Sequence, residues 1–378
     1  MSGGGLTTEQ KDRAAGVLLG LAIGDALGVP YEFRDSPLPA GEAPQMLGGG
    51  LGPYAPGEYS DDTQMAVCIA NVAVTGVDLR SPETLDAIAD GFLHWMIGGA
   101  TDVGNLTRGV LGRAAHRAGS PGERCRAAAQ EAYERSDSSA GNGALMRTAP
   151  VALFALGADR GSDTRTATAE AARLIADLTH ADPLAGDSCV LWCEAIRVAV
   201  LEGRFELAGG LDLLPESRHE HHRGRTHPRD WWARAIDEAS GGDPRRFHKN
   251  GSTFGALKAA WAAITATADD AGEAHGAVRE VAGGAAGTHA RRALETPVRI
   301  RRDTDTVAAI AGSLVGARYG APALPADWRL AVNGWSGVDS PQRYRAADLA
   351  RLGLLTALGG TAVPGDEQIW QQLDEERA

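Results

Sequence analysis

The chain has 378 residues, which is long enough to bury one large hydrophobic core or two smaller ones. Hydrophobic residues make up 43% of it but aromatic residues only 5%, so Ala, Val and Leu must fill most of the interior. This composition favours one all-α core of closely packed helices. A formal net charge of -12 disfavours binding of duplex nucleic acid, which depends on clustered Lys and Arg. It does not exclude a small anionic ligand, because a metal ion or backbone N–H groups can hold a phosphate.

The cysteines show no C-x-x-C pair and no dense pattern typical of a disulfide-rich domain, so we expect reduced core residues at Cys68, Cys125, Cys189 and Cys193. The first eight residues lack a basic region followed by an apolar stretch. No run of about 18 apolar residues without a charge occurs in the chain. We therefore expect a cytoplasmic protein with no membrane partner.

The first helix is predicted to begin at Thr7, because the spacing of Thr7 and Gln10 is that of a capping box. Leu18, Leu21 and Ala22 form its apolar stripe, and Asp25 continues the same stripe. A carboxylate at a core position needs a partner. The helix should end near residues 28–30, since the residue before a proline avoids helical geometry.

Residues 36–57 contain five prolines and six glycines and cannot form regular structure. A loop of this length usually carries function. It leads into Ser60-Asp61-Asp62-Thr63, after which the pattern from Met65 to Val72 is helical. The acidic pair Asp61 and Asp62 should therefore lie at the start of a helix.

Further helices are predicted from residue 81 and around residues 106–118, 122–134, 163–177, 184–201 and 252–266, and again after residue 306, where Gly312 and Gly316 suggest close helix contact. Alternating strand patterns are nearly absent. Residues 202–250 are polar and rich in His, Arg and Trp, and we interpret them as an insertion at the surface. Their histidine run, His219, His221 and His222, is more typical of a solvated segment than of a metal site. We expect a single compact many-helix domain over residues 6–360.

Two short acidic clusters each open an Ala-rich helix: Ser60-Asp61-Asp62-Thr63 and Asp303-Thr304-Asp305-Thr306. Either cluster alone is what an ordinary helix cap prefers. Together they are more informative, because carboxylate and hydroxyl oxygens are the ligands that hard divalent cations select. Aspartates can pack near one another if a cation cancels their repulsion. A dinuclear centre built this way would activate water and hold vicinal hydroxyls of a substrate.

Three weaker signals accompany the clusters. Gly141-Asn142-Gly143 is either a tight turn or a cradle of backbone amides for a diphosphate. His180 follows a predicted helix. A histidine at this position can be a C-terminal cap of the helix or a residue of the site. Glu32 and Asp102 are isolated acids beside turns, and each alone is most simply read as solvated.

These motifs, taken in order, resemble those of the ADP-ribosylglycohydrolase family. The matching segments are Gly16–Phe33, Tyr59–Thr63, Asp102–Arg108, Gly141–Arg147, Thr179-His180 and Asp303–Thr306. Their order and wide spacing match over nearly the whole chain. The resemblance implies an all-α fold with a central cleft that holds two Mg2+ or Mn2+ ions.

The resemblance also implies roles for individual residues. The metal ligands would be Ser60, where relatives often have Thr, and Asp61, Asp62, Asp303, Asp305 and Thr306. Glu32 would contact the ribose or the attacking water, and either Glu32 or Asp62 would take the proton of that water. Gly141, Asn142 and Gly143 would line the diphosphate, while Asp102 and His180 would lie at the cleft near the substrate.

The implied reaction is hydrolysis of the glycosidic bond between ADP-ribose and an acceptor, with an oxocarbenium-like transition state. The expected partner is an ADP-ribosylated protein or a small ADP-ribosyl conjugate, and ADP-ribosyl-arginine is preferred over serine-linked or other conjugates. Two alternatives remain from chemistry alone. Two metals and carboxylates also suit a phosphohydrolase. A member of this fold could also bind ADP-ribose or serve a structural role without catalysis.

Overall fold

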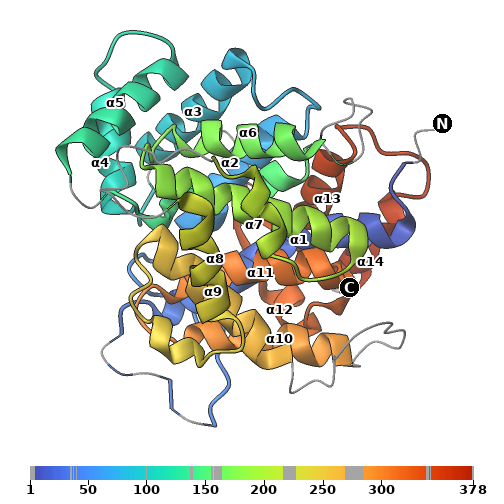
Figure 1. Cartoon of the computed structure of the whole chain (residues 1–378). Coiled ribbons are helices and arrows are strands. Elements are labelled where there is room, and N and C mark those ends of the chain that lie inside the picture. The colour runs from blue at the N-terminus through green and yellow to red at the C-terminus, as the bar shows by residue number, and fades with distance from the viewer. Residues whose placement is uncertain are drawn as a thin grey trace.

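The computed structural model describes residues 5–34, 36, 38–39, 41–98, 100–136, 139–154, 156, 164–215, 227–268, 285–337, 340 and 342–376. Helices make up nearly all of its regular structure (Figure 1). The α-helices are α1 (Thr8–Gly28), α2 (Asp61–Ala73), α3 (Pro82–Ile97), α4 (Asn105–Ala114), α5 (Pro121–Arg135), α6 (Thr164–Ala176), α7 (Pro183–Glu202), α8 (Pro228–Ala239), α9 (Thr253–Ala268), α10 (Ala285–Val298), α11 (Thr304–Tyr319), α12 (Ala326–Ala331), α13 (Ala346–Ala357) and α14 (Glu367–Glu375). The predicted all-α class is confirmed, and each helix predicted from the sequence is present.

Short elements complete the described chain. The 3-10 helices are η1 (Val29–Tyr31), η2 (Asn142–Ala144), η3 (Ala149–Ala152), η4 (Ala208–Leu213), η6 (Pro244–Phe247) and η8 (Ala321–Ala323). Strands β1 (Asn333–Trp335) and β2 (Arg343–Arg345) form one antiparallel pair, in which Gly334 lies opposite Tyr344. The described residues of the Pro- and Gly-rich segment 36–57 contain an isolated bridge between Gly49 and Tyr54 but no helix, as the sequence predicts.

Helix α1 begins and ends where the sequence predicts. Thr7 accepts a hydrogen bond from the backbone N–H of Gln10, and the Gln10 side chain accepts one from the backbone N–H of Thr7. The chain then tightens into η1, which contains Pro30. Thr8–Tyr31 is long and apolar enough to cross a membrane, yet its most apolar window is entirely buried in the protein. A core helix passes the same test, and α1 fits that description.

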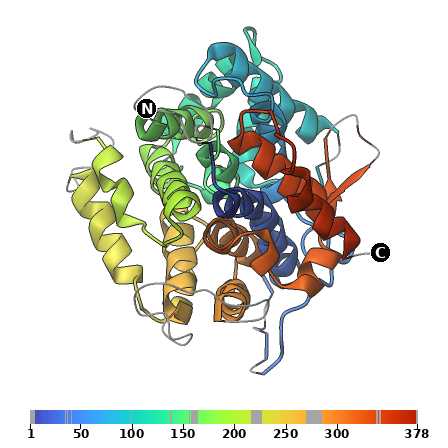
Figure 2. The same ribbon diagram turned by 90° about the vertical axis from the view of Figure 1, so that its right-hand side faces the viewer.

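Helices α1 and α11 run side by side through the centre, and the other helices surround them (Figure 2). Glycines repeat every four residues on one face of α1, a spacing that keeps them on the same side of a helix. A Cβ added at Gly20 would lie 2.2 Å from the carbonyl oxygen of Gly312, and one at Gly16 would lie 2.3 Å from that of Gly316. The two backbones are therefore in direct contact, which confirms the close helix contact expected at Gly312 and Gly316.

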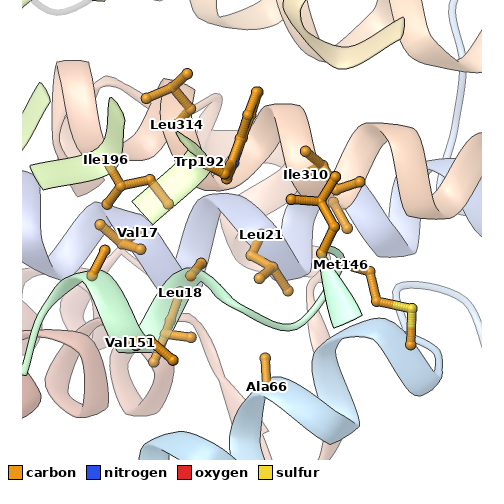
Figure 3. Close-up of a cluster of buried hydrophobic side chains, with 14 of the residues drawn as sticks. Val17, Leu18, Leu21, Ala66, Met146, Val151, Trp192, Ile196, Ile310 and Leu314 are labelled. Carbon is orange, nitrogen blue, oxygen red and sulfur yellow. The ribbon is translucent and has the colours of Figure 1, made fainter. Parts of the chain in front are cut away.

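Aliphatic side chains from many helices fill the space around this pair. Figure 3 shows Leu18 and Leu21 of α1 facing Ala66 of α2 and Val151 of η3, with Ile310 of α11 nearby. The largest side chains in the interior include Trp192, which is fully buried and donates its indole N–H to the Ser313 hydroxyl. All four cysteines are free and buried, as predicted.

In the described part of residues 202–250 most residues are exposed or half-buried, but a few side chains that the prediction placed at the surface reach the core. Trp232 of α8 is 0% exposed, and Leu207, Leu214 and Phe247 also belong to the core. Although the segment is polar on average, it contains a few large apolar residues that lie on the side facing the interior. The histidine run at 219, 221 and 222 lies outside the described residues. The domain limits at 6 and 360 stay a prediction.

Candidate active site

The site is organised by Asp25, the buried carboxylate of α1. It accepts hydrogen bonds from both the backbone N–H and the hydroxyl of Ser60, at 2.9 and 2.8 Å. It also accepts from the backbone N–H and the hydroxyl of Thr63, at 3.0 and 2.6 Å. Asp25 thus caps the start of α2 although it belongs to another helix, and it accepts from N–H groups that a helix start leaves without partners. Ser60, which the sequence assigns as a metal ligand, donates its proton to Asp25 and keeps its oxygen lone pairs for another contact.

The first turns of α2 and α11 meet beside Asp25. Oxygens of Asp25, Asp62 and Asp305 lie within 4.8 Å of one another. Thr306 donates its hydroxyl proton to Asp62 Oδ1 at 3.1 Å, while the buried Asp62 Oδ2 has no hydrogen-bond partner among the described residues. Burial and the charges of neighbouring carboxylates raise the pKa values of both Asp62 and Asp305 well above the ordinary value. A bound cation would offset the repulsion between these carboxylates.

A second group of acids adjoins the first. Oxygens of Glu32, Asp303 and Asp305 also lie within 4.8 Å of one another. Burial, followed by the charges of Asp303, Asp102 and Asp61, raises the pKa of Glu32 to about 9. Burial and then the Asp303 charge likewise raise the pKa of the half-buried Asp102. Asp305 belongs to both groups, so it would be shared if two cations were bound.

The turn at η2 is tied to these acids. Asn142 donates through Nδ2 to Asp303 Oδ2 at 2.7 Å and to the backbone carbonyl of Asn250 at 3.1 Å. Asn250 in turn accepts from the Asp303 backbone N–H at 3.3 Å and donates to the Arg301 carbonyl at 3.0 Å. The Asn142 side chain, predicted to line the diphosphate, therefore positions a predicted metal ligand in this structure. Asn250 was not singled out from the sequence.

His180 packs against the glycine turn. A Cβ at Gly143 would lie 3.0 Å from His180 Cε1, and one at Gly141 would lie 3.3 Å from its Nε2, so the ring is in close contact with both glycines. Thr179 Oγ1 accepts from Arg147 at 2.6 Å and lies 2.7 Å from His180 Nδ1, to which it can donate its own proton. This arrangement favours the tautomer with hydrogen on Nε2. Burial and the Arg147 charge lower the pKa of His180 to about 3, so the ring is neutral at physiological pH.

The donor set fits a divalent cation. The buried carboxylates are clustered, and one of their oxygens has no partner in the described part of the chain. The hydroxyls of Ser60 and Thr306 contact the carboxylates of Asp25 and Asp62. Oxygen ligands of this kind suit Mg2+ or Mn2+. The N-terminal ends of α2 and α11 also point into the cluster and contribute positive partial charge. A bound divalent ion would supply Lewis acidity and lower the pKa of coordinated water.

Segments from both ends of the chain meet at this site, as a shared site for the two acidic clusters requires. The structure brings together Asp62, Asp303 and Asp305 among the predicted ligands, with the Thr306 hydroxyl on Asp62. Asp61 belongs to neither oxygen cluster but is near enough for its charge to raise the pKa of Glu32. Glu32, Asp102 and the η2 turn lie beside these acids. The reading of the two acidic clusters as helix caps accounts for only part of the observation, because neither Ser60 nor Asp303 caps its helix with its side chain. Sequence reasoning noted that Asp25 was anomalous but gave it no role in the site.

Comparisons with known proteins agree with this geometry. A family model described as ADP-ribosylglycohydrolase matches residues 6–361. The chain is 30% identical over 328 residues to the ADP-ribosylarginine hydrolase Tri1 of Pseudomonas putida (strain GB-1), covering 85% of this chain and 75% of that protein. It is 35% identical over 188 residues to an ADP-ribosyl-[dinitrogen reductase] glycohydrolase of Rhodospirillum rubrum, covering 47% and 55% of the two chains.

A solved structure described as an ADP-ribosylglycohydrolase-related protein complex superposes with a TM-score of 0.60 at 24% identity, covering 94% of this chain and 100% of that chain. At this sequence identity, the structural similarity is evidence for the fold alone. The family model carries the assignment further, because residues 6–361 include every segment that builds the acidic site. The chain belongs to the ADP-ribosylglycohydrolase family and is a hydrolase that acts on glycosyl bonds.

Proposed function

We propose that this enzyme cleaves the glycosidic bond between ADP-ribose and an arginine side chain of a modified protein, using two divalent cations. The observation that carries the proposal is the pair of overlapping oxygen clusters that share Asp305. Support for arginine as the acceptor comes from the relative named as an ADP-ribosylarginine hydrolase. Support for Mg2+ or Mn2+ comes from the all-oxygen ligand set.

The chain's own residues would divide the work by position. Glu32 lies half-buried at the end of η1, next to Asp303 and Asp305, where it can take up or release a proton beside the reacting carbon. Burial, followed by the surrounding anions, raises its pKa to about 9, and a bound cation would offset the anions and favour the ionised form that accepts a proton. Asp62, with one unpartnered oxygen, is the other candidate base.

The glycine turn would hold the rest of the substrate. His180 is neutral and carries its hydrogen on Nε2, the atom that faces Gly141, so it can donate a hydrogen bond without adding charge. Backbone N–H groups of this turn would bind a phosphate of the substrate. Asn142 would couple this half of the site to the acids, because its amide holds Asp303 in place.

The test is incubation of the purified chain with ADP-ribosyl-arginine, with a serine-linked conjugate and with ADP-ribose itself, in the presence of Mg2+, Mn2+ or EDTA. We expect release of ADP-ribose from the arginine conjugate, and loss of that activity in EDTA. Asp305→Ala should abolish turnover while the far-UV circular dichroism spectrum stays that of an α-helical protein. Release of AMP or inorganic phosphate would identify a phosphohydrolase instead.

The acceptor assignment has its own control. Faster release from the serine-linked conjugate, under conditions where both substrates are saturating, would assign the enzyme to O-linked ADP-ribose. Binding of ADP-ribose without turnover of any conjugate at saturating Mg2+ or Mn2+ would indicate a member that has kept the fold but lost the chemistry.

A further inference from the structure

A cavity of about 850 Å3 lies beside the acidic site and takes no part in the reaction described above. Its lining comes from three separate segments, within residues 33–39, 245–248 and 299–302. Its volume is in the range of sites that bind ligands. The cavity is thus large enough to receive several side chains of a partner.

The cavity is strongly basic, although the whole chain carries a formal net charge of -12. Among the described residues, those that line it include no acid, and the positive ones are Arg34, Arg245, Arg299, Arg301 and Arg302, with His248 beside them. A concentration of one sign of charge in a concave surface attracts ligands of the opposite sign. The cavity therefore fits an anionic partner.

Two segments of the cavity wall are joined directly to residues of the acidic site. Phe33 follows Glu32 directly, Arg302 precedes Asp303 directly, and the Phe33 backbone N–H donates to the Arg302 carbonyl at 2.8 Å. The two segments that carry the acids therefore run on together into the cavity wall. A group attached to the ribose and leaving the acidic cluster in this direction would enter the cavity.

The backbone of this wall is held in an unusual conformation. Phe33, Arg301 and Arg302 have φ angles of 47°, 77° and 63°, and they are the non-glycine residues with positive φ in the described parts of the chain. This conformation is strained for a non-glycine residue, and residues of this kind concentrate at functional sites. All three line the same cavity. The fold thus holds these side chains in fixed directions at some cost in stability.

We propose that this cavity binds Asp and Glu side chains of the acceptor protein that flank the ADP-ribosylated residue. The inference rests on the proposed function, because it requires a protein acceptor. The guanidinium group pairs with a carboxylate through two parallel hydrogen bonds. The exposed Arg34 and Arg245 come from different segments, which suits an extended ligand with several anions better than a single small ion. Leu38, Pro39 and Ile300 provide apolar surface for the aliphatic parts of such a segment.

The chain offers a matched pair of variants. Arg245 is exposed and paired with Asp243, two residues before it, and it lies in the cavity wall. Arg204 is also exposed and paired with an acid two residues before it, Glu202, as well as with Glu206, but it is not part of the wall. Arg245→Gln and Arg204→Gln therefore remove the same charge from similar surroundings. Arg34→Gln combined with Arg245→Gln removes two wall charges.

The experiment measures kcat/KM for two peptides that carry one ADP-ribosyl-arginine and differ only in flanking Asp or Asn residues. We expect the acidic peptide to be preferred, with the preference reduced about threefold by Arg245→Gln, further reduced in the double variant and unchanged by Arg204→Gln. The preference of the wild-type enzyme for the acidic peptide should also weaken between 50 mM and 500 mM NaCl, because salt screens exposed charges. Equal rates for the two peptides in the wild-type enzyme would overturn the proposal.

Free ADP-ribosyl-arginine, assayed in parallel, separates this inference from the proposed function. If it is hydrolysed but flanking acids have no effect, the proposed function stands and the cavity proposal fails. If no arginine conjugate is hydrolysed, the proposed function fails, and binding of the unmodified acidic peptide, followed by fluorescence anisotropy, still decides whether the cavity accepts carboxylates. Tighter binding of a single-stranded oligonucleotide with the same number of charges would overturn the proposal and assign the cavity to nucleic acid.

Discussion

The contact between α1 and α11 should tolerate no added side chain, and Gly20→Ala tests this directly. The new Cβ would lie 2.2 Å from the Gly312 carbonyl oxygen and 3.2 Å from the Gly316 Cα. The obstructing atoms belong to the backbone, so no side-chain rotation can relieve the clash. The two helices would have to separate by about 1 Å to reach ordinary van der Waals contact.

The expected magnitude follows from two opposing effects. Replacing Gly by Ala inside a helix stabilises it by about 0.5–1 kcal/mol. Overpacking of a close contact destabilises by about 1–3 kcal/mol, and a backbone neighbour puts this site at the upper end. We expect Gly20→Ala to lower the free energy of unfolding by about 2 kcal/mol. Gly112→Ala in α4 is the control, since nothing lies within 4 Å of its added Cβ, and it should stabilise by about 0.5–1 kcal/mol.

The assay is urea unfolding in EDTA, followed by circular dichroism, with wild type and both variants measured together. Opposite signs for the two substitutions are the diagnostic result. The same comparison in Mg2+ should show weaker cation binding by Gly20→Ala, because displacement of α11 also displaces Asp305 from Asp62. If Gly20→Ala were as stable as Gly112→Ala, the close approach of the two helices would be refuted.

Three further predictions concern the site. Asp305→Asn should be at least as stable as wild type in EDTA, because it removes one of several crowded anions. Mg2+ should raise the melting temperature of the wild-type protein but not that of the variant. A large loss of stability of the variant in EDTA would instead indicate a purely structural residue. Asp25→Asn should destabilise by about 2–4 kcal/mol in urea titrations, since an amide has one acceptor oxygen for the four donors of Ser60 and Thr63; an unchanged midpoint would contradict the role assigned to Asp25. His180 has a folded-state pKa of about 3, below its ordinary value of 6.5, so the unfolded state binds more protons and stability falls as the pH drops from about 6.5 toward 3. At pH 5 this amounts to about 2 kcal/mol relative to pH 7, and the loss should be smaller in His180→Asn when both proteins are unfolded in EDTA.

The helices were predictable because their signals are local. The capping box at Thr7 and Gln10, and the Ser-Pro start of α3, each appear in the structure where the sequence placed them. The residues of the acidic site were predictable through resemblance, and their spacing alone left an ordinary helix cap as a rival. What separates the two readings is a distance between segments that are far apart along the chain, such as Asp62 and Asp305.

The features that were missed depend on tertiary contacts. Asp25 stood out as a carboxylate on an apolar stripe, but only the fold shows that it serves the start of α2. Asn250 carries no local signal, because its partners Asn142 and Asp303 come from two other segments of the chain. Trp232 was assigned to the surface because its neighbours in sequence are charged, whereas burial depends on which face of α8 meets α9.

The glycine face of α1 helps to position the residues of the acidic site. The glycines at 16, 20, 24 and 28 meet α11 along its whole length, and the last of them lies against the backbone of Asp305, with 2.3 Å between its added Cβ and the Asp305 Cα. The same end of α1 is fixed by the Thr304 hydroxyl, which donates to the Gly28 carbonyl at 3.0 Å. Close packing thus determines how far Asp305 stands from Asp25 and Asp62. Because catalytic geometry is lost with displacements of about 1 Å, helix packing far from the acids should influence turnover as strongly as the acids' immediate neighbours do.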